Sequence, residues 1–127
     1  MNPQKKKILV AEDDLFLANV YKSKLKKEGF DFQIAKDGDE TMNLLKEFQP
    51  DLLILDLVMR GKDGFRVLEM IKLEPTLKNV IIVVASNLGQ KEDINKCIAL
   101  GASDYFIKSD VTLEAIITKV KNLLNIN

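Results

Sequence analysis

The 127-residue sequence contains no histidine and a single cysteine, Cys97. The absence of histidine removes most histidine-based catalysis and most zinc sites from consideration. One cysteine cannot form a disulfide within the chain, which suits a reducing, cytoplasmic setting. The sequence also lacks a surplus of charge of either sign, because 19 basic side chains balance 19 acidic ones. Overall charge therefore favours neither nucleic-acid binding nor membrane binding.

Long hydrophobic runs are absent as well. No apolar stretch approaches the roughly 20 residues of a membrane span, and the basic start is not followed by a signal-peptide core. With 46% hydrophobic and 30% charged residues, the composition is that of an ordinary globular protein. The length predicts one domain over residues 1–127, with its core at about residues 6–124 and no output domain.

Short apolar runs alternate with amphipathic stretches along the whole chain. The runs predict buried strands and the stretches of period 3.6 predict helices. The expected strands are Lys7–Ala11, Asp31–Ala35, Leu52–Leu55, Val80–Ala85 and Tyr105–Ile107. The expected helices are about Asp14–Glu28, Gly38–Phe48, Gly64–Leu73 and Val111–Leu124, with a short fifth helix that turns Ile94, Cys97 and Ile98 inward and stops at Gly101.

This alternation predicts the α/β class, with parallel strands joined by right-handed crossovers. We expect a doubly wound five-stranded sheet of order 2-1-3-4-5, covered by helices on both faces in a flavodoxin-like three-layer sandwich. In such a sheet the carboxyl ends of the first, third, fourth and fifth strands open into one crevice, which is where ligands bind.

Polar side chains end each of these four strands. They are Glu12 with Asp13, Asp56, Ser86 and Lys108. Three carboxylates that lie close together repel one another, and a shared cation removes that repulsion. Oxygen ligands without histidine or cysteine suit a hard ion, Mg²⁺ or Mn²⁺. The strand ends therefore predict a divalent-cation site with a lysine beside it.

The same strand ends are suited to a phosphoryl group carried on a carboxylate. Asp56 is the expected nucleophile, and Lys108 with the cation offsets negative charge on the transferring oxygens. Ser86 is placed to donate a hydrogen bond to one of those oxygens. Taken singly, each residue has an ordinary structural explanation as a cap, a turn residue or a solvated charge. Four strand ends with complementary chemistry favour the joint interpretation.

The chain resembles the receiver domain of two-component response regulators from about Lys6 to Leu124. The segments that carry the resemblance are ILVAEDD, DLLILD with a downstream DG, VVAS, and GASDYFIK. The resemblance implies that Asp56 accepts a phosphoryl group from a histidine kinase or a phosphotransfer protein. It also implies that the backbone carbonyl of Val58 joins Glu12, Asp13 and Asp56 as a ligand of Mg²⁺.

The resemblance also assigns a switch. Ser86 becomes the switch hydroxyl, Lys108 the ion-pair partner of the phosphate, and Tyr105 the aromatic side chain that changes rotamer on activation. The surface of the fourth helix, fifth strand and last helix then signals to a separate effector protein or through a homodimer. The domain assists its own phosphorylation and dephosphorylation and is not an enzyme with a free substrate.

Two positions depart from the family pattern in the loops around the site. Arg60 stands where the family usually has proline, and we expect Gly61 and Gly64 to supply the flexibility of that turn. Ser109 stands where a proline, often cis, usually follows the lysine. Because a cis bond without proline costs about 3–4 kcal/mol, we predict a trans Lys108–Ser109 bond with Lys108 still reaching the site.

Three further positions bear on access to Asp56 and on the lifetime of its phosphoryl group. Asn87 replaces a small residue and either narrows access to Asp56, offers another donor, or faces water. Val58 and Leu88 flank the position of the water that attacks phosphoaspartate in this family. Both side chains are apolar and cannot orient that water, which predicts slow autodephosphorylation.

Other functions remain open on the sequence alone. A receiver-like interaction module that works without phosphorylation would need none of Asp56, Lys108 and the acidic pair. A phosphatase of the haloacid dehalogenase kind would need a second aspartate at the position that Val58 occupies. A flavin-binding module would need a phosphate-cradling loop after the first strand, where Glu12, Asp13 and Asp14 would repel phosphate.

Overall fold

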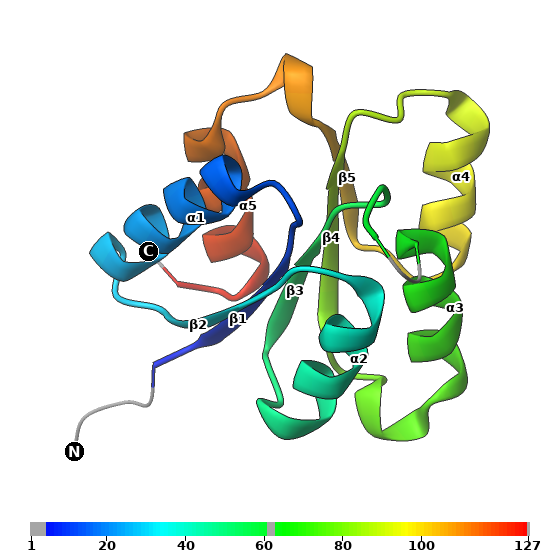
Figure 1. The fold of residues 1–127 in the computed structure, drawn as a ribbon, viewed down its shortest axis with the longest axis horizontal. Helices are drawn as coiled ribbons and strands as arrows, with labels where there is room; N and C mark the ends of the chain where they lie inside the picture. Colours follow the sequence, from blue (N-terminus) through cyan, green and yellow to red (C-terminus); the bar gives the residue numbers. More distant parts are fainter. Residues whose placement is uncertain (1–4, 61–62, 127) are drawn as a thin grey trace.

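The computed structural model describes residues 5–60 and 63–126, which form a parallel sheet between two layers of helices (Figure 1). The strands are β1 (Lys7–Ala11), β2 (Asp31–Ala35), β3 (Leu52–Leu55), β4 (Ile81–Ser86) and β5 (Asp104–Ile107). The helices are α1 (Leu15–Lys27), α2 (Gly38–Glu47), α3 (Gly64–Leu73), α4 (Lys91–Ala99) and α5 (Leu113–Leu123), with short 3₁₀ helices η1 (Pro75–Leu77) and η2 (Lys108–Asp110).

The strand order β2-β1-β3-β4-β5 is the one that the sequence predicts. All four neighbouring pairs are parallel. Strand β3 is buried along its whole length, whereas β2, at an edge of the sheet, alternates exposed and partly buried residues. Long apolar runs therefore mark the central strands, which are covered on both faces, and the alternating run marks an edge.

Two hydrophobic cores fill the space between the sheet and its helices. Helices α1 and α5 cover one face, and α2, α3 and α4 cover the other (Figure 1). Leu25 and Val120 are fully buried in the first core, and Leu45, Val67 and Cys97 are fully buried in the second. No helix within residues 5–60 and 63–126 is long and apolar enough to cross a membrane.

Side-chain caps explain where most of the helices begin. The carboxylates of Asp14, Asp37 and Asp63 accept hydrogen bonds from backbone N–H groups in the first turns of α1, α2 and α3. Thr112 does the same for α5. Caps of this kind satisfy N–H groups that have no partner within the helix. Two of these helices, α1 and α3, thus begin beside the strand ends that carry Glu12 and Asp56.

The structure corrects several details of the prediction. Helix boundaries differ by one or two residues, because Asp14 and Glu28 cap α1 and do not belong to it. Ile98, expected to face inward, is 48% exposed, so α4 buries the Cys97 side of the helix and leaves Ile98 at the surface. Gly61 lies outside the described residues.

Gly64 has a different role from the flexibility expected of it. It is the first residue of α3, and its backbone N–H donates to the Leu57 carbonyl at 2.9 Å. A Cβ atom at this position would lie 2.5 Å from Leu57 Cα and 2.7 Å from the Asp56 carbonyl oxygen. Glycine is required here because α3 passes directly against the end of β3.

Candidate functional site

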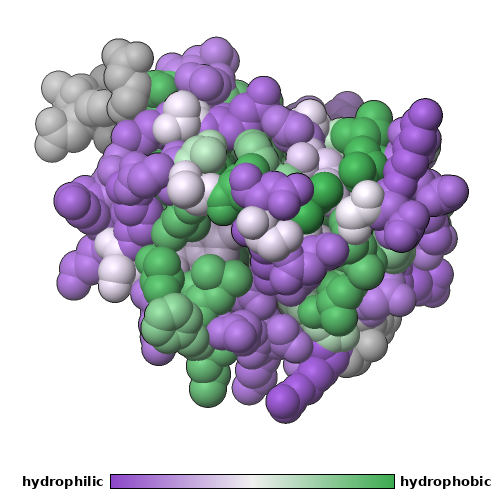
Figure 2. Space-filling view, turned by 90° about the horizontal axis from the view of Figure 1, so that it is seen from above, coloured by the Kyte–Doolittle hydropathy of each residue, from purple (hydrophilic) through white to green (hydrophobic). Residues whose placement is uncertain are grey.

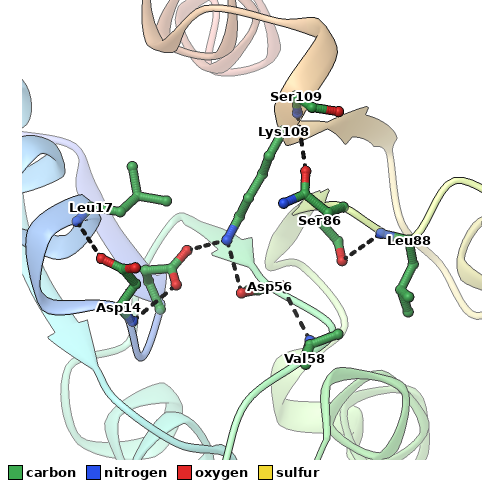
Figure 3. Close-up of polar contacts among 10 residues, drawn as sticks. Asp14, Leu17, Asp56, Val58, Ser86, Leu88, Lys108 and Ser109 are labelled. Atoms are coloured by element: carbon green, nitrogen blue, oxygen red, sulfur yellow. Dashed lines mark hydrogen bonds and ion pairs between the residues drawn. The ribbon is translucent and has the colours of Figure 1, made fainter.

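The polar strand ends meet at one edge of the sheet, as the topology requires. Lys108 extends from the end of β5 toward Asp56 at the end of β3 (Figure 3). Its ammonium nitrogen lies 2.9 Å from Asp56 Oδ2 and 2.6 Å from Glu12 Oε1. Both carboxylates are nearly fully buried, whereas the lysine side chain is partly exposed. Residues from three strands thus share one small charged cluster.

Each of the two buried carboxylates is held at both oxygens. Glu12 Oε2 accepts the Asp14 backbone N–H at 3.1 Å, and Asp56 Oδ1 accepts the Val58 backbone N–H at 3.1 Å. In both cases the backbone donor lies two residues after the carboxylate, and Lys108 binds the other oxygen. The carboxylates therefore have fixed orientations. Sequence reasoning missed these backbone contacts, because any residue type can supply an N–H.

A third carboxylate completes the cluster. One oxygen each from Glu12, Asp13 and Asp56 can be chosen so that all lie within 4.8 Å of one another. Asp13 is partly exposed and has no hydrogen bond or ion pair within residues 5–60 and 63–126. Three carboxylates against a single ammonium leave the cluster with excess negative charge. This all-oxygen donor set fits a hard divalent cation and could hold one.

The protonation equilibria reflect this crowding. Burial raises the pKa of Glu12 above its ordinary value, and the hydrogen bond from Lys108 offsets only part of that effect. Burial acts to lower the pKa of Lys108, but its hydrogen bonds to Glu12 and Asp56 outweigh burial and raise it. Lys108 therefore stays charged at neutral pH and acts as a fixed cation beside Asp56.

The two residues assigned to the switch make no hydrogen bond to Glu12, Asp56 or Lys108 in the described structure. Ser86 ends β4, is fully buried, and its Oγ accepts the Leu88 backbone N–H at 3.3 Å. Tyr105 is partly buried, and its hydroxyl donates to the Leu88 carbonyl. Burial raises the pKa of Tyr105 to about 12, so this hydroxyl remains a donor. Leu88 thus connects the two side chains.

The loop after β5 departs from the family pattern at Ser109 and still places Lys108 at the site. No peptide bond in the described residues is cis, so the Lys108–Ser109 bond is trans and Lys108 still reaches Asp56, as predicted. The side chain of Val58 is 59% exposed beside Asp56. Asn87 makes a contact that the sequence did not indicate, because its Oδ1 accepts the Ser109 backbone N–H at 3.0 Å.

Comparison with known proteins identifies the family. The family model described as "Response regulator receiver domain" matches residues 8–121. The chain belongs to this family. The receiver domain is also similar to solved structures with TM-scores near 0.8 to 0.9. One is the signal receiver domain of a DNA-binding response regulator (merR) from Colwellia psychrerythraea 34H, with 28% identity, a TM-score of 0.87, and coverage of 95% of this chain and 99% of that one.

Two further structures show the same likeness. The receiver domain of the Francisella response regulator 1452 has 27% identity and a TM-score of 0.86, covering 94% of this chain and 96% of that one. The response regulator Rcp1, solved in a Mn²⁺-bound form, has 29% identity and a TM-score of 0.78, covering 93% of this chain and 91% of that one. Receiver domains are signalling domains, and this family interacts with kinases and effector proteins.

Proposed function

We propose that this receiver domain, over about residues 6–124, accepts a phosphoryl group on Asp56 from a histidine kinase or a phosphotransfer protein. The observation that carries the proposal is the pair of contacts that Lys108 makes with Glu12 and Asp56. They place a fixed positive charge beside a buried carboxylate whose other oxygen is already oriented by the Val58 N–H. Preorganised charge of this kind is the main contribution of proteins to phosphoryl transfer.

In the proposed reaction an oxygen of Asp56 attacks the phosphorus atom of phosphohistidine. The new O–P bond forms as the N–P bond breaks, and the electron pair of that bond returns to the imidazole of the donor. Lys108 offsets the negative charge of the phosphoryl oxygens, and Glu12 keeps its ammonium group in place. These 127 residues contain no histidine, so the phosphohistidine must lie outside them.

Magnesium is the proposed cofactor, with Mn²⁺ as a substitute. Glu12, Asp13, Asp56 and the backbone carbonyl of Val58 would hold it, and it would supply positive charge that neutralises phosphoryl oxygens. The proposal is supported by the oxygen-only donor set and by the Mn²⁺-bound form of the similar protein Rcp1.

A cytoplasmic location is part of the proposal, because Cys97 is a free, buried thiol that suits a reducing compartment.

The contacts of Leu88 suggest how phosphorylation is transmitted. Ser86 Oγ accepts the Leu88 N–H, and this bond would break if the Ser86 side chain rotates to bring its hydroxyl to a phosphoryl oxygen. Leu88 then moves, and its carbonyl is the acceptor of the Tyr105 hydroxyl. Phosphorylation would thereby change the packing of Tyr105 against α4 and the α4–β5–α5 surface. An effector protein or a second copy would read this surface.

The test is the intact mass of the protein after incubation with acetyl phosphate. With Mg²⁺ we expect the wild type to gain one phosphoryl group, and we expect no gain with a chelator or in Asp56→Asn. A wild type that gains nothing would contradict the proposal and favour an interaction module that works without phosphorylation. Asp51→Asn is the matched control, because Asp51 precedes β3 at the opposite edge of the sheet and should leave the gain unchanged.

A further inference from the structure

Asn87 and Ser109 join the two loops that carry Ser86 and Lys108. The amide oxygen of Asn87, directly after β4, accepts the backbone N–H of Ser109 at 3.0 Å across 22 residues of sequence. Figure 3 shows Ser109 and Lys108 as neighbours above the carboxylates. The bond therefore fixes the backbone one residue after Lys108 to the backbone one residue after Ser86.

In the part of the chain that the structure describes, no other side chain caps the N–H that Asn87 accepts. Ser109 is the second residue of η2, and the residue before η2, Ile107, makes no side-chain capping hydrogen bond. Early N–H groups of a helix lack partners within it and are usually satisfied by the side chain just before the helix. Here a side chain from a different loop takes that role. The residue after β4 therefore holds the start of η2, which includes the backbone of Lys108.

This contact depends on both of the unusual residues. A proline at position 109 would have no N–H to donate, and a small apolar residue at position 87 would have no oxygen to accept it. The two departures from the family pattern therefore form one interaction.

We propose that Asn87 is a positioning residue that holds Lys108 against Asp56 through the Ser109 N–H. A lysine side chain has many rotamers, so the place of its ammonium group depends on how firmly its backbone is anchored. Ser109 has no ring to fix its φ angle as a proline would, and the Asn87 contact supplies the missing restraint. Asn87 acts through Lys108 and does not touch the phosphoryl group.

The first experiment needs no phosphorylation. NMR spectra would be compared for four proteins: wild type, Asn87→Ala, Ser109→Pro and Ser109→Ala. Two quantities would be followed, the hydrogen-exchange rate of the amide at position 109, where there is one, and the side-chain signals of Lys108. Asn87→Ala should speed Ser109 amide exchange by a factor of about 2 to 10 and shift the Lys108 signals. Ser109→Ala keeps the N–H and should do neither. Unchanged exchange and Lys108 signals in Asn87→Ala would overturn the proposal.

The second experiment measures phosphorylation and rests on the proposed function. Asn87→Ala should lower the maximal rate with acetyl phosphate and Mg²⁺ by a factor of about 2 to 10, with the half-saturating donor concentration unchanged. Asn87→Ala should leave the rate unchanged when it is added to Ser109→Pro. It should lower the rate by the same factor as in wild type when it is added to Ser109→Ala. An equal effect in the Ser109→Pro background would show that Asn87 acts without the Ser109 N–H.

The two experiments separate the possible failures. A wild type that takes up no phosphate would contradict the proposed function, while the NMR comparison would still decide whether Asn87 positions Lys108. A change in the half-saturating donor concentration alone would mean that Asn87 controls access to Asp56, which overturns the positioning role. If Asn87→Ala lowers the free energy of unfolding in denaturant but changes neither the phosphorylation rate nor the Lys108 signals, the hydrogen bond is purely structural. That result would also overturn the positioning role.

Discussion

The ammonium group of Lys108 lies 2.9 Å from Asp56 although the two residues are 52 positions apart in the sequence. The same group lies 2.6 Å from Glu12, so one lysine joins two buried carboxylates from different strands. A cation bound by Glu12, Asp13 and Asp56 would use oxygens of the same cluster. In the proposed reaction, Lys108 and the cation would therefore compete for negative charge before phosphorylation and act together on the phosphoryl group after it.

Replacing this lysine should separate the two effects. Lys108→Met removes a positive charge from the cluster, so we expect Mg²⁺ to bind about tenfold or more tightly by calorimetry. We also expect phosphorylation by acetyl phosphate to slow about 100-fold, because the variant lacks a preorganised charge at the phosphoryl oxygens. Lys119→Met, which removes a surface lysine paired with Asp104, should change neither quantity. Weaker Mg²⁺ binding in Lys108→Met would contradict this account.

The apolar side chains of Val58 and Leu88 should make the phosphorylated form long-lived. Neither side chain can orient the attacking water, so we expect Val58→Asn or Leu88→Glu to speed the loss of the phosphoryl group severalfold. The decay would be followed by intact mass after the phosphodonor is removed. Val58→Ala tests whether the bulk of the side chain matters, since it opens the site without adding a polar group. If neither polar substitution speeds decay, the prediction fails.

How much of the molecule the sequence predicts depends on the range of each interaction. The topology and the meeting of Glu12, Asp56 and Lys108 follow from apolar runs that end in polar residues, because parallel strands bring their carboxyl ends together. The exposure of Ile98 did not follow, since periodicity alone does not fix which flank of a short helix faces the sheet. The Asn87 contact with Ser109 depends on loop conformation, although two unusual residues in adjacent loops were a signal that could have been noticed.

Gly64 should be intolerant of any side chain. A Cβ atom there would meet backbone atoms at 2.5 and 2.7 Å, and backbone cannot move aside as a side-chain tip can. We expect Gly64→Ala to lower the free energy of unfolding by about 1–3 kcal/mol in urea. Gly89→Ala is the control, because its Cβ would meet only side-chain atoms of Ile107, the nearest at 3.3 Å. Similar stabilities of Gly64→Ala and wild type would contradict the close approach.

Away from the site, Glu28 forms ion pairs with Lys24 of α1 and Lys121 of α5. Glu28 accepts hydrogen bonds from Lys121 and from Lys24, the latter at 3.3 Å, and these lower the pKa of Glu28 from its ordinary value of 4.5. A carboxyl group with a lowered pKa stabilises the fold above its unfolded pKa, and that stability is lost as pH falls through the folded pKa. The difference in the free energy of unfolding between wild type and Glu28→Gln should therefore be largest near neutral pH and should shrink below about pH 4.5.

Urea unfolding at neutral and acidic pH would measure this difference. Glu47→Gln is the matched control, because Glu47 is exposed at the end of α2 and has no ion pair within residues 5–60 and 63–126. The control should show little difference from wild type at any pH. A Glu28→Gln difference that stays the same from neutral to acidic pH would show that the effect of Glu28 is not electrostatic.

The central claim is that Asp56 is the carboxylate that forms the acyl phosphate. Borohydride reduces an aspartyl phosphate to homoserine, so reduction after treatment with acetyl phosphate and Mg²⁺, followed by peptide mass spectrometry, locates the modified residue directly. We expect homoserine at position 56 of the wild type and none when Mg²⁺ is chelated. Homoserine at position 13, or no homoserine anywhere in a folded, Mg²⁺-treated protein, would contradict it.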